Sequence, residues 1–472
     1  KALPTLPEKF FYNPMAGYDI YARVSKSDGE DEDGNQIFLH RNVFVCSLAY
    51  PLIRSRDVDN LRWGTHWCVH TEDGVRNEVR VDHGELAVKS GEPIRVMFME
   101  AGARLSPDNE SKRLFLELLH TAVPNERWRF ADKLGWHGKT FVLPDEAIGT
   151  SGEPFKMSIR NERFNVAGTL AEWQSEVALP CMRSTRMVFA IGVALSAPLL
   201  GMLGAGGVIF NLYGRSSTGK TTALDVASSV WGGGRAGYKR SWRTTDNALE
   251  ATCREHNDAL LCLDEMNQAV RSKGGVQALG ECAYMIANGV GKSRMTQTAE
   301  ARSVATWRVV GLSSGEKTLA DFLSSDDRER QAGQAVRCID IPSDAEKGYG
   351  IFDGVPDELA HLTHAAAGAA LSQRLKAASA KCYGHAARAF LRRLVLSYDA
   401  LQPKLASRAE TLTRMWAHGA DGQVERVAHS FAIVAVAGRV AELTGLLPWP
   451  LGTTEDAVKE LFDEWLKARG GA

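Results

Sequence analysis

The sequence predicts an α/β domain in the middle of the chain, preceded by a β-rich region and followed by a helical region. Residues 166–342 alternate apolar strand-like runs with helix-like segments, an order typical of a parallel sheet with helices on both faces. Two of these runs, 208–213 and 259–264, are continuously apolar and end in polar residues, as buried parallel strands do. We therefore expect three domains, at residues 1–165, 166–342 and 343–472.

The composition fits a globular protein of several domains. The chain has 472 residues, 44% hydrophobic and 24% charged, and these shares exclude a largely disordered or fibrous chain. Lys and Arg number 56 against 57 Asp and Glu, so any nucleic-acid contact has to come from a local basic patch. The eight cysteines form no C-x-x-C pair, which predicts reduced thiols in a cytoplasmic protein. The chain begins at Lys1 without Met or a signal-peptide pattern, which indicates that the natural N-terminus lies upstream.

The first region is predicted to consist mainly of strands. Residues 111–123 have helical spacing, and 134–149 have the pattern of a small hairpin with a turn at His137-Gly138. Single histidines such as His66 and His137 have no second ligand at metal spacing, so we expect ordinary surface or core residues. The expected strands, rich in β-branched and aromatic residues, are 37–46, 66–71, 75–88 and 93–101.

One uncharged segment is long enough to cross a membrane. Residues 187–212 carry no charged side chain, but Pro198 and the glycines of 201–207 divide the segment into two shorter pieces. We therefore expect a buried helix followed by a buried strand, and no membrane partner. In the last region, amphipathic spacing predicts helices at 357–378, 384–401, 422–445 and 454–468.

The strongest motif is Gly214-Arg-Ser-Ser-Thr-Gly-Lys-Thr221, which satisfies G-x-x-x-x-G-K-[ST] between an apolar strand and a helix. Glycines let backbone N–H groups turn toward phosphates, and the helix that follows points its positive end at them. We expect Lys220 to bridge the β- and γ-phosphates of ATP and Thr221 to hold Mg²⁺. The residues expected around the nucleotide are Gly214, Ser217, Thr218, Gly219, Lys220, Thr221 and Thr222.

Two carboxylates follow the apolar run 259–263. Asp264 is expected to hold the Mg²⁺ shell, and Glu265 to polarise the attacking water as the catalytic base. The polar end of a third strand, 307–314, supplies Ser313 or Ser314 as a group that hydrogen-bonds the γ-phosphate or the water. The alternative for these serines is an ordinary turn at the end of a strand.

Arg337 precedes a short apolar strand, after these three elements. In an oligomeric ATPase, an arginine at this point presents its guanidinium to the γ-phosphate bound by a neighbouring subunit. We expect Arg337 to have this role, with Arg330 and Arg328 as reserves. The other interpretation is a solvated arginine or a local salt bridge.

Two short basic segments are candidates for DNA contact. Lys292 and Arg294 precede the third strand, where they are expected to contact phosphates; the alternatives are the neighbouring ATP site and a solvated hairpin. Lys239 and Arg240 lie between Tyr238 and Trp242, and aromatic rings beside basic groups suit base stacking. Packing of Trp242 under the sheet is the alternative for this second segment.

These segments carry a resemblance to a known family. GRSSTGKT, ALLCLDE, WRVVGLSSGE and QAVRCIDIP resemble AAA+ ATPases, nearest to the superfamily III helicases of viruses and plasmids. With LGWHGKTFVLPD, SWRTTDNALEATCREHNDALLCLDE and ANGVGKSRM, the chain more closely resembles a family catalogued as a domain of unknown function. That family occurs in phage, plasmid and genomic-island replication proteins and includes the self-loading helicases of staphylococcal cassette elements. The resemblance covers roughly residues 130–450.

The resemblance implies a hexameric ring that hydrolyses ATP with Mg²⁺ at subunit interfaces and pulls DNA through its centre. It assigns Lys220, Thr221, Asp264 and Glu265 to the ATP site, a serine of 313–314 to the sensing position and Arg337 to the finger. The sensor arginine of many AAA+ proteins has no unambiguous counterpart, and Arg426 is the one suggestion. We identify no primase signature in the sequence, and whether one precedes Lys1 stays open. A primase or other replication protein is among the expected partners.

We therefore expect an ATP-driven helicase or translocase that acts on single-stranded or forked DNA during replication of a mobile element. Two alternatives use the same ATP site. One is an ATP-switched DNA-binding module that assembles at an origin or regulates, and the other is an ATPase that remodels proteins. Basic loops favour DNA over protein as the substrate, and the resemblance favours unwinding over switching.

Overall fold

The chain packs into two units. The first comprises Lys1–Asp132 and Ser151–Ser158, and the second comprises Lys133–Thr150 and Ile159–Ala472. The computed structural model describes residues 3–30, 36–57, 60–131, 133–149, 153–157, 161–234, 237–243, 245–270, 275–291, 304–324 and 336–470.

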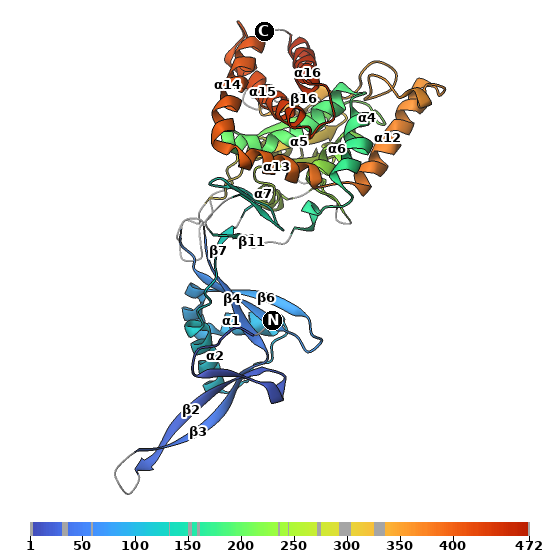
Figure 1. Cartoon of the computed structure of the whole chain (residues 1–472). Helices are drawn as coiled ribbons and strands as arrows, with labels where there is room; N and C mark the ends of the chain where they lie inside the picture. Colours follow the sequence, from blue (N-terminus) through green and yellow to red (C-terminus); the bar gives the residue numbers. More distant parts are fainter. Residues whose placement is uncertain are drawn as a thin grey trace. The chain divides into compact units, whose positions relative to one another are not determined.

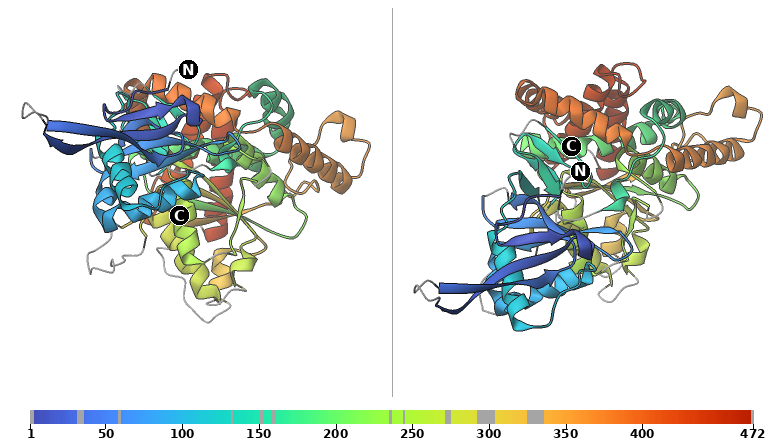
Figure 2. Two further views of the ribbon diagram at one scale, coloured as in Figure 1. Left: turned by 90° about the horizontal axis from the view of Figure 1, so that it is seen from below. Right: turned by 60° about the horizontal axis from the view of Figure 1, so that its bottom comes forward.

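The first unit contains two sheets and two α-helices. A five-stranded sheet has the order β11-β7-β4-β5-β6, and a three-stranded antiparallel sheet has the order β1-β2-β3. The helices α1 and α2 cover one face of the larger sheet, where Trp67, Phe98 and Phe115 form the buried centre of the core (Figure 2). The elements are β1 Phe10–Asn13, β2 Asp19–Glu30, β3 Gln36–Cys46, β4 Ala49–Arg56, β5 Gly64–His70, β6 Arg76–Asp82, the 3₁₀ helix η2 His83–Gly91, α1 Glu92–Glu100, α2 Asn109–Thr121, β7 Arg127–Ala131 and β11 Phe155–Met157.

Two predicted strands of this unit need correction. The strand predicted at 75–88 ends at Asp82, where η2 begins. Of the strand predicted at 93–101, residues 93–100 belong to α1, which begins after Gly91 in a left-handed conformation and has Pro93 in its first turn. Ile94 and Phe98, four residues apart, are buried, whereas Val96 and Met99 are about half exposed. The β-branched composition suggested a strand, but the spacing of the buried side chains is that of a helix.

The second unit is built on a five-stranded parallel sheet (Figure 1). Its order is β13-β14-β15-β12-β16, which places β15 between the strand that precedes the glycine-containing loop and the strand that ends in Asp264. Leu261 and Leu263 pack with α7 and α9 on one face, whereas Cys262 contacts α6 on the other. The strands are β12 Val208–Tyr213, β13 Arg240–Ser241, β14 Ala259–Asp264, β15 Val309–Gly315 and β16 Cys338–Pro342. The predicted runs 208–213 and 259–264 are confirmed to the residue.

The uncharged segment is the central helix of this unit. Helix α5 (Thr185–Leu203) is long and apolar enough to cross a membrane, but 89% of its apolar window is buried in the protein. The prediction of a buried helix followed by a buried strand is confirmed, and the division lies at the glycines. The part predicted for Pro198 is wrong, because the helix continues past it to Gly204, whose left-handed backbone ends it. Proline leaves the carbonyl four residues earlier without its helical partner. That carbonyl, of Ala194, accepts a hydrogen bond from Nε1 of Trp231 (2.7 Å).

The helical C-terminal region is confirmed, with two corrections. The predicted helix 357–378 begins only at His364, where the hydroxyl of Thr363 accepts a hydrogen bond from the backbone N–H of Ala366. The predicted helix 384–401 is divided at Ser397, whose backbone is not helical. The helices of this unit are α3 Leu170–Trp173, α4 Leu179–Cys181, α5, α6 Lys220–Trp231, α7 Asp246–Glu255, α8 Asn267–Val270, α9 Gly275–Asn288, α10 Leu319–Ser324, α12 His364–Lys381, α13 His385–Leu396, α14 Tyr398–Trp416, α15 Gly422–Leu443 and α16 Thr453–Arg469.

The predicted hairpin at 134–149 is also present. It forms a small antiparallel sheet of β8 Gly135–His137, β9 Thr140–Val142 and β10 Ala147–Ile148. Gly138 lies in the left-handed region at the expected turn (φ 63°). All eight cysteines are free thiols, as the sequence predicts.

Candidate nucleotide site

The loop after β12 has the backbone conformations that the glycine motif predicts. Gly214 has a φ of 147°, and a Cβ there would lie 2.6 Å from Oγ of Ser343. Gly219 has a φ of 106° and directly precedes α6, so the N-terminal end of α6 faces the loop. Ser217 is left-handed as well (φ 65°), although it is not glycine. Left-handed backbone at several points of a short loop turns its N–H groups toward one centre, the arrangement that binds phosphates.

The ammonium group of Lys220 closes this loop. Nζ donates hydrogen bonds to the carbonyl oxygens of Gly214 (2.7 Å) and Arg215 (2.6 Å). Burial lowers the pKa of Lys220, although the negative charges of Glu316 and Asp264 act in the opposite direction. Lys220 is thus a half-buried cation whose present acceptors are neutral carbonyls, which a phosphate oxygen can replace.

A second loop, residues 348–351, packs against residues 214–219, which we call the phosphate loop after the motif that they carry. The backbone N–H of Ile351 donates to the carbonyl of Thr218 (2.8 Å). A Cβ on Gly350 would lie 2.8 Å from that same carbonyl, and a Cβ on Gly219 would lie 2.6 Å from Cγ2 of Ile351. The two loops therefore form a tight seam that leaves no space for larger residues at either glycine.

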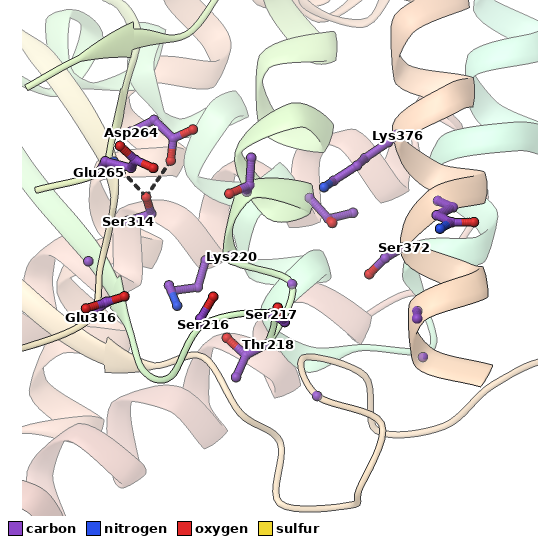
Figure 3. A pocket seen from close by; sticks show the side chains of 18 of the residues that line it. Ser216, Ser217, Thr218, Lys220, Asp264, Glu265, Ser314, Glu316, Ser372 and Lys376 are labelled. Atoms are coloured by element: carbon purple, nitrogen blue, oxygen red, sulfur yellow. Dashed lines mark hydrogen bonds between the residues drawn. The ribbon is translucent and has the colours of Figure 1, made fainter. Parts of the chain in front are cut away.

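The two carboxylates lie where β14 ends, beside the end of β15 (Figure 3). Oγ of Ser314 donates to Oδ1 of Asp264 (2.6 Å) and accepts from the backbone N–H of Glu265 (3.1 Å). Glu265 has a left-handed backbone (φ 56°), and its carboxylate accepts a hydrogen bond from the side-chain amide of Gln268. Strained backbone of this kind in a non-glycine residue is concentrated at functional sites.

The structure separates the two predicted serines. Ser314 lines the cavity and joins both carboxylate residues, whereas Oγ of Ser313 accepts from Nε1 of buried Trp242 (2.9 Å). Alternation along β15 directs these two side chains to opposite faces of the sheet. Only Ser314 therefore lies at the site.

The basic groups of the second segment, Lys239 and Arg240, form ion pairs within the chain. Nζ of Lys239 lies 2.7 Å from Oδ1 of Asp225 and 3.5 Å from Oδ2 of Asp264. Although burial alone would lower it, the hydrogen bond and charge of Asp225 raise the pKa of Lys239. Arg240 pairs with Glu255 (2.5 Å), so both basic groups are occupied.

The two aromatic residues of that segment lie in the core. Tyr238 is 2% exposed and donates to the carbonyl of Leu260 (2.7 Å), and Trp242 is 3% exposed. The interpretation that Trp242 packs under the sheet is confirmed. Lys239 and Arg240 are ion-paired within the chain and about a quarter exposed, so their contact with DNA stays a prediction. Lys239 belongs to the surroundings of Asp264.

These elements enclose a cavity of 680 Å³ (Figure 3). One wall is the phosphate loop with Lys220, Thr221 and Thr222, and another is Asp264, Glu265, Ser314 and Glu316. The hydroxyl of Thr221 and the carboxylate of Asp264 are hard oxygen ligands of the kind that Mg²⁺ prefers. The cavity therefore combines the glycine-containing loop and Lys220 with oxygen atoms of the type that coordinate a divalent cation.

A third wall was not predicted. Helix α12 directs Ser372 and Lys376 into the cavity, and small residues line its side facing the phosphate loop (Figure 3). The signal in the sequence was the spacing of Ala365, Gly368, Ala369 and Ser372, which places small side chains on one helical face. A Cβ on Gly368 would lie 2.4 Å from the carbonyl of Tyr349, so this face also holds the second loop in place.

Arg337 lies at the amino ends of the strands, whereas this cavity lies at their carboxyl ends. It precedes β16, and its carbonyl accepts from the backbone N–H of Ile209, near the start of β12. The phosphate loop follows the other end of β12, about 17 Å away at 3.3 Å per residue. The Arg337 guanidinium carbon lies 4.4 Å from the centre of the Tyr284 ring.

Arg337 lines a second cavity, of 1020 Å³, together with Arg414 and Arg426. The suggestion that Arg426 senses the nucleotide of its own chain finds no support, because Arg426 is not among the residues that line the first cavity. Arginines of three different elements therefore gather at the edge of the sheet that is remote from the phosphate loop.

The other predicted DNA segment, with Lys292 and Arg294, lies outside the described residues, as do Arg328 and Arg330. The residues on either side of the segment with Lys292 and Arg294 are described, and Val290 and Thr306 form an antiparallel bridge there. The roles predicted for Lys292 and Arg294 therefore stay predictions.

Among the described residues, no group of three or more His, Cys, Asp or Glu side chains has the geometry to hold a metal ion. His66 lies in a hydrogen-bonded array, with Nε2 2.8 Å from Oγ of Ser55 and Nδ1 2.6 Å from Oε1 of Glu78. This arrangement has the order of a hydrolase triad, but Ser55 is fully buried and no substrate reaches it. The expectation of ordinary residues is confirmed for His66 and for His137, which bonds the carbonyl of Lys133.

Comparison with known proteins gives one family and one shared fold. The model of the family described as "Domain of unknown function (DUF927)" matches residues 22–306, more than half of the chain. A solved structure described as "SCCmec type IV Cch - active helicase" matches with a TM-score of 0.66 and 15% sequence identity, over 99% of this chain and 80% of that chain. At this identity the likeness shows a common fold, so the predicted helicase-like relationship is confirmed at that level.

Other comparisons add little. A structure described as "The A form apo structure of NrS-1 C terminal region-CTR(305-718)" covers 83% of this chain and 88% of that chain at 10% identity. Its TM-score is 0.27, which is too low to support an argument. No curated protein matches the chain. The family match begins at residue 22, in the first unit, upstream of the region where the sequence resemblance was seen.

Proposed function

The chain belongs to the family described as a domain of unknown function (DUF927), and on that premise we propose that it is an ATP-driven DNA helicase or translocase. The observation that carries the proposal is the 680 Å³ cavity at the carboxyl edge of a parallel sheet, with Lys220 on one side and Asp264, Glu265 and Ser314 on the other. Ligands of open α/β sheets bind at this edge. The likeness in fold to a structure described as an active helicase supports DNA as the substrate.

Each residue of the cavity has a distinct role in the proposed hydrolysis. The backbone N–H groups of the phosphate loop and Nζ of Lys220 bind the phosphates, and Thr221 and Asp264 hold Mg²⁺, which neutralises charge on the phosphates. Glu265 accepts the proton of the attacking water, and the left-handed backbone at Glu265 is held by the hydrogen bond to Ser314. The same set of groups supports our proposal that the second unit is an AAA+-like P-loop core.

The position of Arg337 supports a homo-oligomer, and we propose a hexameric ring. Arg337 lies about 17 Å from the phosphate loop of its own chain, so a role in hydrolysis requires a neighbouring copy. The remote edge with Arg337, Arg414 and Arg426 then faces the neighbour's cavity. An arginine supplied in this way stabilises the charge that develops on the transferred phosphoryl group. Replication of a mobile element, with a primase or another replication protein as partner, is the proposed setting.

The test is strand displacement on a forked DNA, with ATP hydrolysis followed in the same samples. The variant Lys220→Ala should lose both activities, and Arg337→Ala should bind ATP normally but lose hydrolysis. Mixed oligomers of Lys220→Ala and Arg337→Ala chains should recover part of the hydrolysis, because some interfaces combine an intact cavity with an intact arginine. Failure of mixing to restore any activity would contradict action between subunits.

Two other outcomes would replace the helicase proposal. Hydrolysis that is stimulated by DNA without displacement would indicate a nucleotide-switched DNA-binding protein. Hydrolysis that is indifferent to DNA, with no displacement, would indicate a protein-remodelling ATPase.

A further inference from the structure

Four arginines occupy neighbouring positions on two strands of the first unit. The strands β4 and β7 are parallel and adjacent, and their register pairs Arg54 with Arg127 and Arg56 with Arg129 (Figure 1). Paired positions on neighbouring strands are about 4.8 Å apart, and alternate positions along a strand about 6.7 Å. The side chains therefore form a compact block on one face of the sheet. We call this block, with Arg62 and Trp63 beside it, the arginine patch.

The charge of the arginine patch is only partly neutralised. Glu153 forms ion pairs with Arg56 (2.8 Å) and Arg129 (3.1 Å). No carboxylate within the described residues forms an ion pair with Arg54, Arg62 or Arg127; Arg62 and Arg127 are exposed and Arg54 is half-buried. Like charges directly opposite each other on neighbouring strands are destabilising. The carboxylate of Glu153 offsets this repulsion for Arg56 and Arg129, whereas the opposed pair Arg54–Arg127 represents a cost to the fold that a polyanionic ligand would offset.

An aromatic ring is part of the same surface. The indole of half-buried Trp63 has the guanidinium carbons of Arg54 and Arg56 at 5.1 Å and 5.0 Å from its centre. Contact with the ring holds both long side chains in one orientation, so less side-chain entropy is lost when a ligand binds.

We propose that the arginine patch binds the phosphate backbone of single-stranded DNA. Guanidinium groups donate paired hydrogen bonds to phosphate oxygens, and the block is only two β-strands wide, which matches one backbone better than the two backbones of a duplex. An aromatic group beside basic groups is the arrangement that binds unpaired strands. This contact belongs to the first unit and goes beyond the ATP-driven function proposed for the second.

The test measures binding of fluorescein-labelled oligothymidylate to the full chain by anisotropy, at several salt concentrations. The variant Arg54→Gln/Arg127→Gln removes two arginines that have no ion pair and leaves Glu153 with its partners. The matched control, Arg76→Gln/Arg113→Gln, removes two exposed arginines of the same unit that lie outside the patch. Arg54→Lys/Arg127→Lys keeps the charge and tests whether charge alone accounts for the effect.

For single strands, each lost phosphate contact reduces the slope of log K against log salt by about 0.7, so the patch variant should lose about 1.4. If the patch variant and the wild type bind equally at about 1 M salt, a slope smaller by about 1.4 means that the variant binds about 25-fold more weakly at about 0.1 M salt. The control pair should keep the wild-type slope, and the Lys variant should keep most of it. ATP hydrolysis without DNA should be unchanged in all three variants.

A slope equal to that of the control pair would overturn the proposal, and so would a larger loss on duplex than on single-stranded DNA. The circular dichroism spectrum and thermal unfolding of each variant establish that it is folded. Binding is measured in the Lys220→Ala background as well, where no hydrolysis occurs. A change in slope there would support the patch even if strand displacement were absent, so the two proposals can fail separately.

Discussion

The variant Ser314→Ala should reduce ATP hydrolysis about 30-fold, because Ser314 joins both carboxylate residues of the cavity. Its Oγ donates to Asp264 at 2.6 Å and accepts from the backbone N–H of Glu265 at 3.1 Å. Alanine removes both hydrogen bonds and adds no new contact. Asp264 then loses a fixed donor, and the left-handed backbone of Glu265 loses its hydrogen-bond acceptor.

The magnitude follows from the kind of bonds that are lost. A hydrogen bond to a charged group contributes about 1.5–3 kcal/mol, and a neutral one about 0.5–1.5 kcal/mol. Asp264 is about a quarter exposed, at 25%, so water replaces part of the first bond. We therefore take about 2 kcal/mol as the increase in the activation free energy of hydrolysis. Since about 1.36 kcal/mol corresponds to a tenfold change in rate, the expected decrease is about 30-fold.

The adjacent Ser313→Ala variant is the matched control. Its Oγ bonds Trp242 on the other face of the sheet, so the variant should lower the free energy of unfolding by about 1–3 kcal/mol and leave turnover close to wild type. Steady-state ATP hydrolysis and urea unfolding are measured for both variants. Wild-type turnover in Ser314→Ala, or an equal loss of turnover in the two variants, would refute the reasoning.

Three further predictions concern the surroundings of this cavity and the core. Gly219→Ala should weaken ATP binding at least tenfold, since its Cβ would lie 2.6 Å from Ile351 at a φ of 106°; calorimetric binding at the wild-type affinity would contradict this. Lys239→Met should weaken ATP binding about tenfold in EDTA but little in Mg²⁺, because the ammonium 3.5 Å from Asp264 offsets its charge when no metal is bound. Fluorescent-nucleotide titrations measure both conditions, Lys239→Arg is the control, and equal losses in the two conditions would speak against this role. Burial lowers the pKa of His256 from 6.5 to about 3, so the unfolded state binds the proton first and the free energy of unfolding falls as the pH drops below 6.5. This group alone contributes about 1.4 kcal/mol per pH unit. The His256→Phe variant should lose that dependence in urea titrations, and an unchanged dependence would assign it to other groups.

The parallel sheet and the phosphate loop could be predicted because local sequence determines them. The strands 208–213 and 259–264 are almost continuously apolar, with Asn211 and Asp264 as their polar residues, and such runs are typical of buried parallel strands. The glycines at 214 and 219 mark positions with positive φ, where other residues are strained. In each case a few neighbouring residues carry the whole signal.

Other features depend on contacts between distant parts of the chain. Pro198 was expected to end a helix, but a carbonyl freed by proline is tolerated when a donor reaches it, and that donor is Trp231. The contact of Lys239 with Asp264, and the wall formed by α12, join segments far apart in sequence. No pattern within either segment specifies such a contact, so the cavity could be predicted only in part.

The arginine patch was not predicted for a related reason. Arg54 and Arg56 are separated from Arg127 and Arg129 by about seventy residues, and only the pairing of β4 with β7 brings them together. In the sequence, each pair is a short run with acidic residues close by. Local charge counts therefore missed a patch that the sheet register creates.

The seam between the phosphate loop and residues 348–351 has a consequence for how this chain can diverge. Because the Thr218 carbonyl is both the acceptor for Ile351 and the atom that a larger residue at Gly350 would strike, a change in one loop requires a matching change in the other. A chimera that takes the 348–351 loop from a distant relative, but keeps this phosphate loop, would carry mismatched surfaces at the point where the nucleotide binds. Exchange of both loops together is the smallest transplant that preserves the fit.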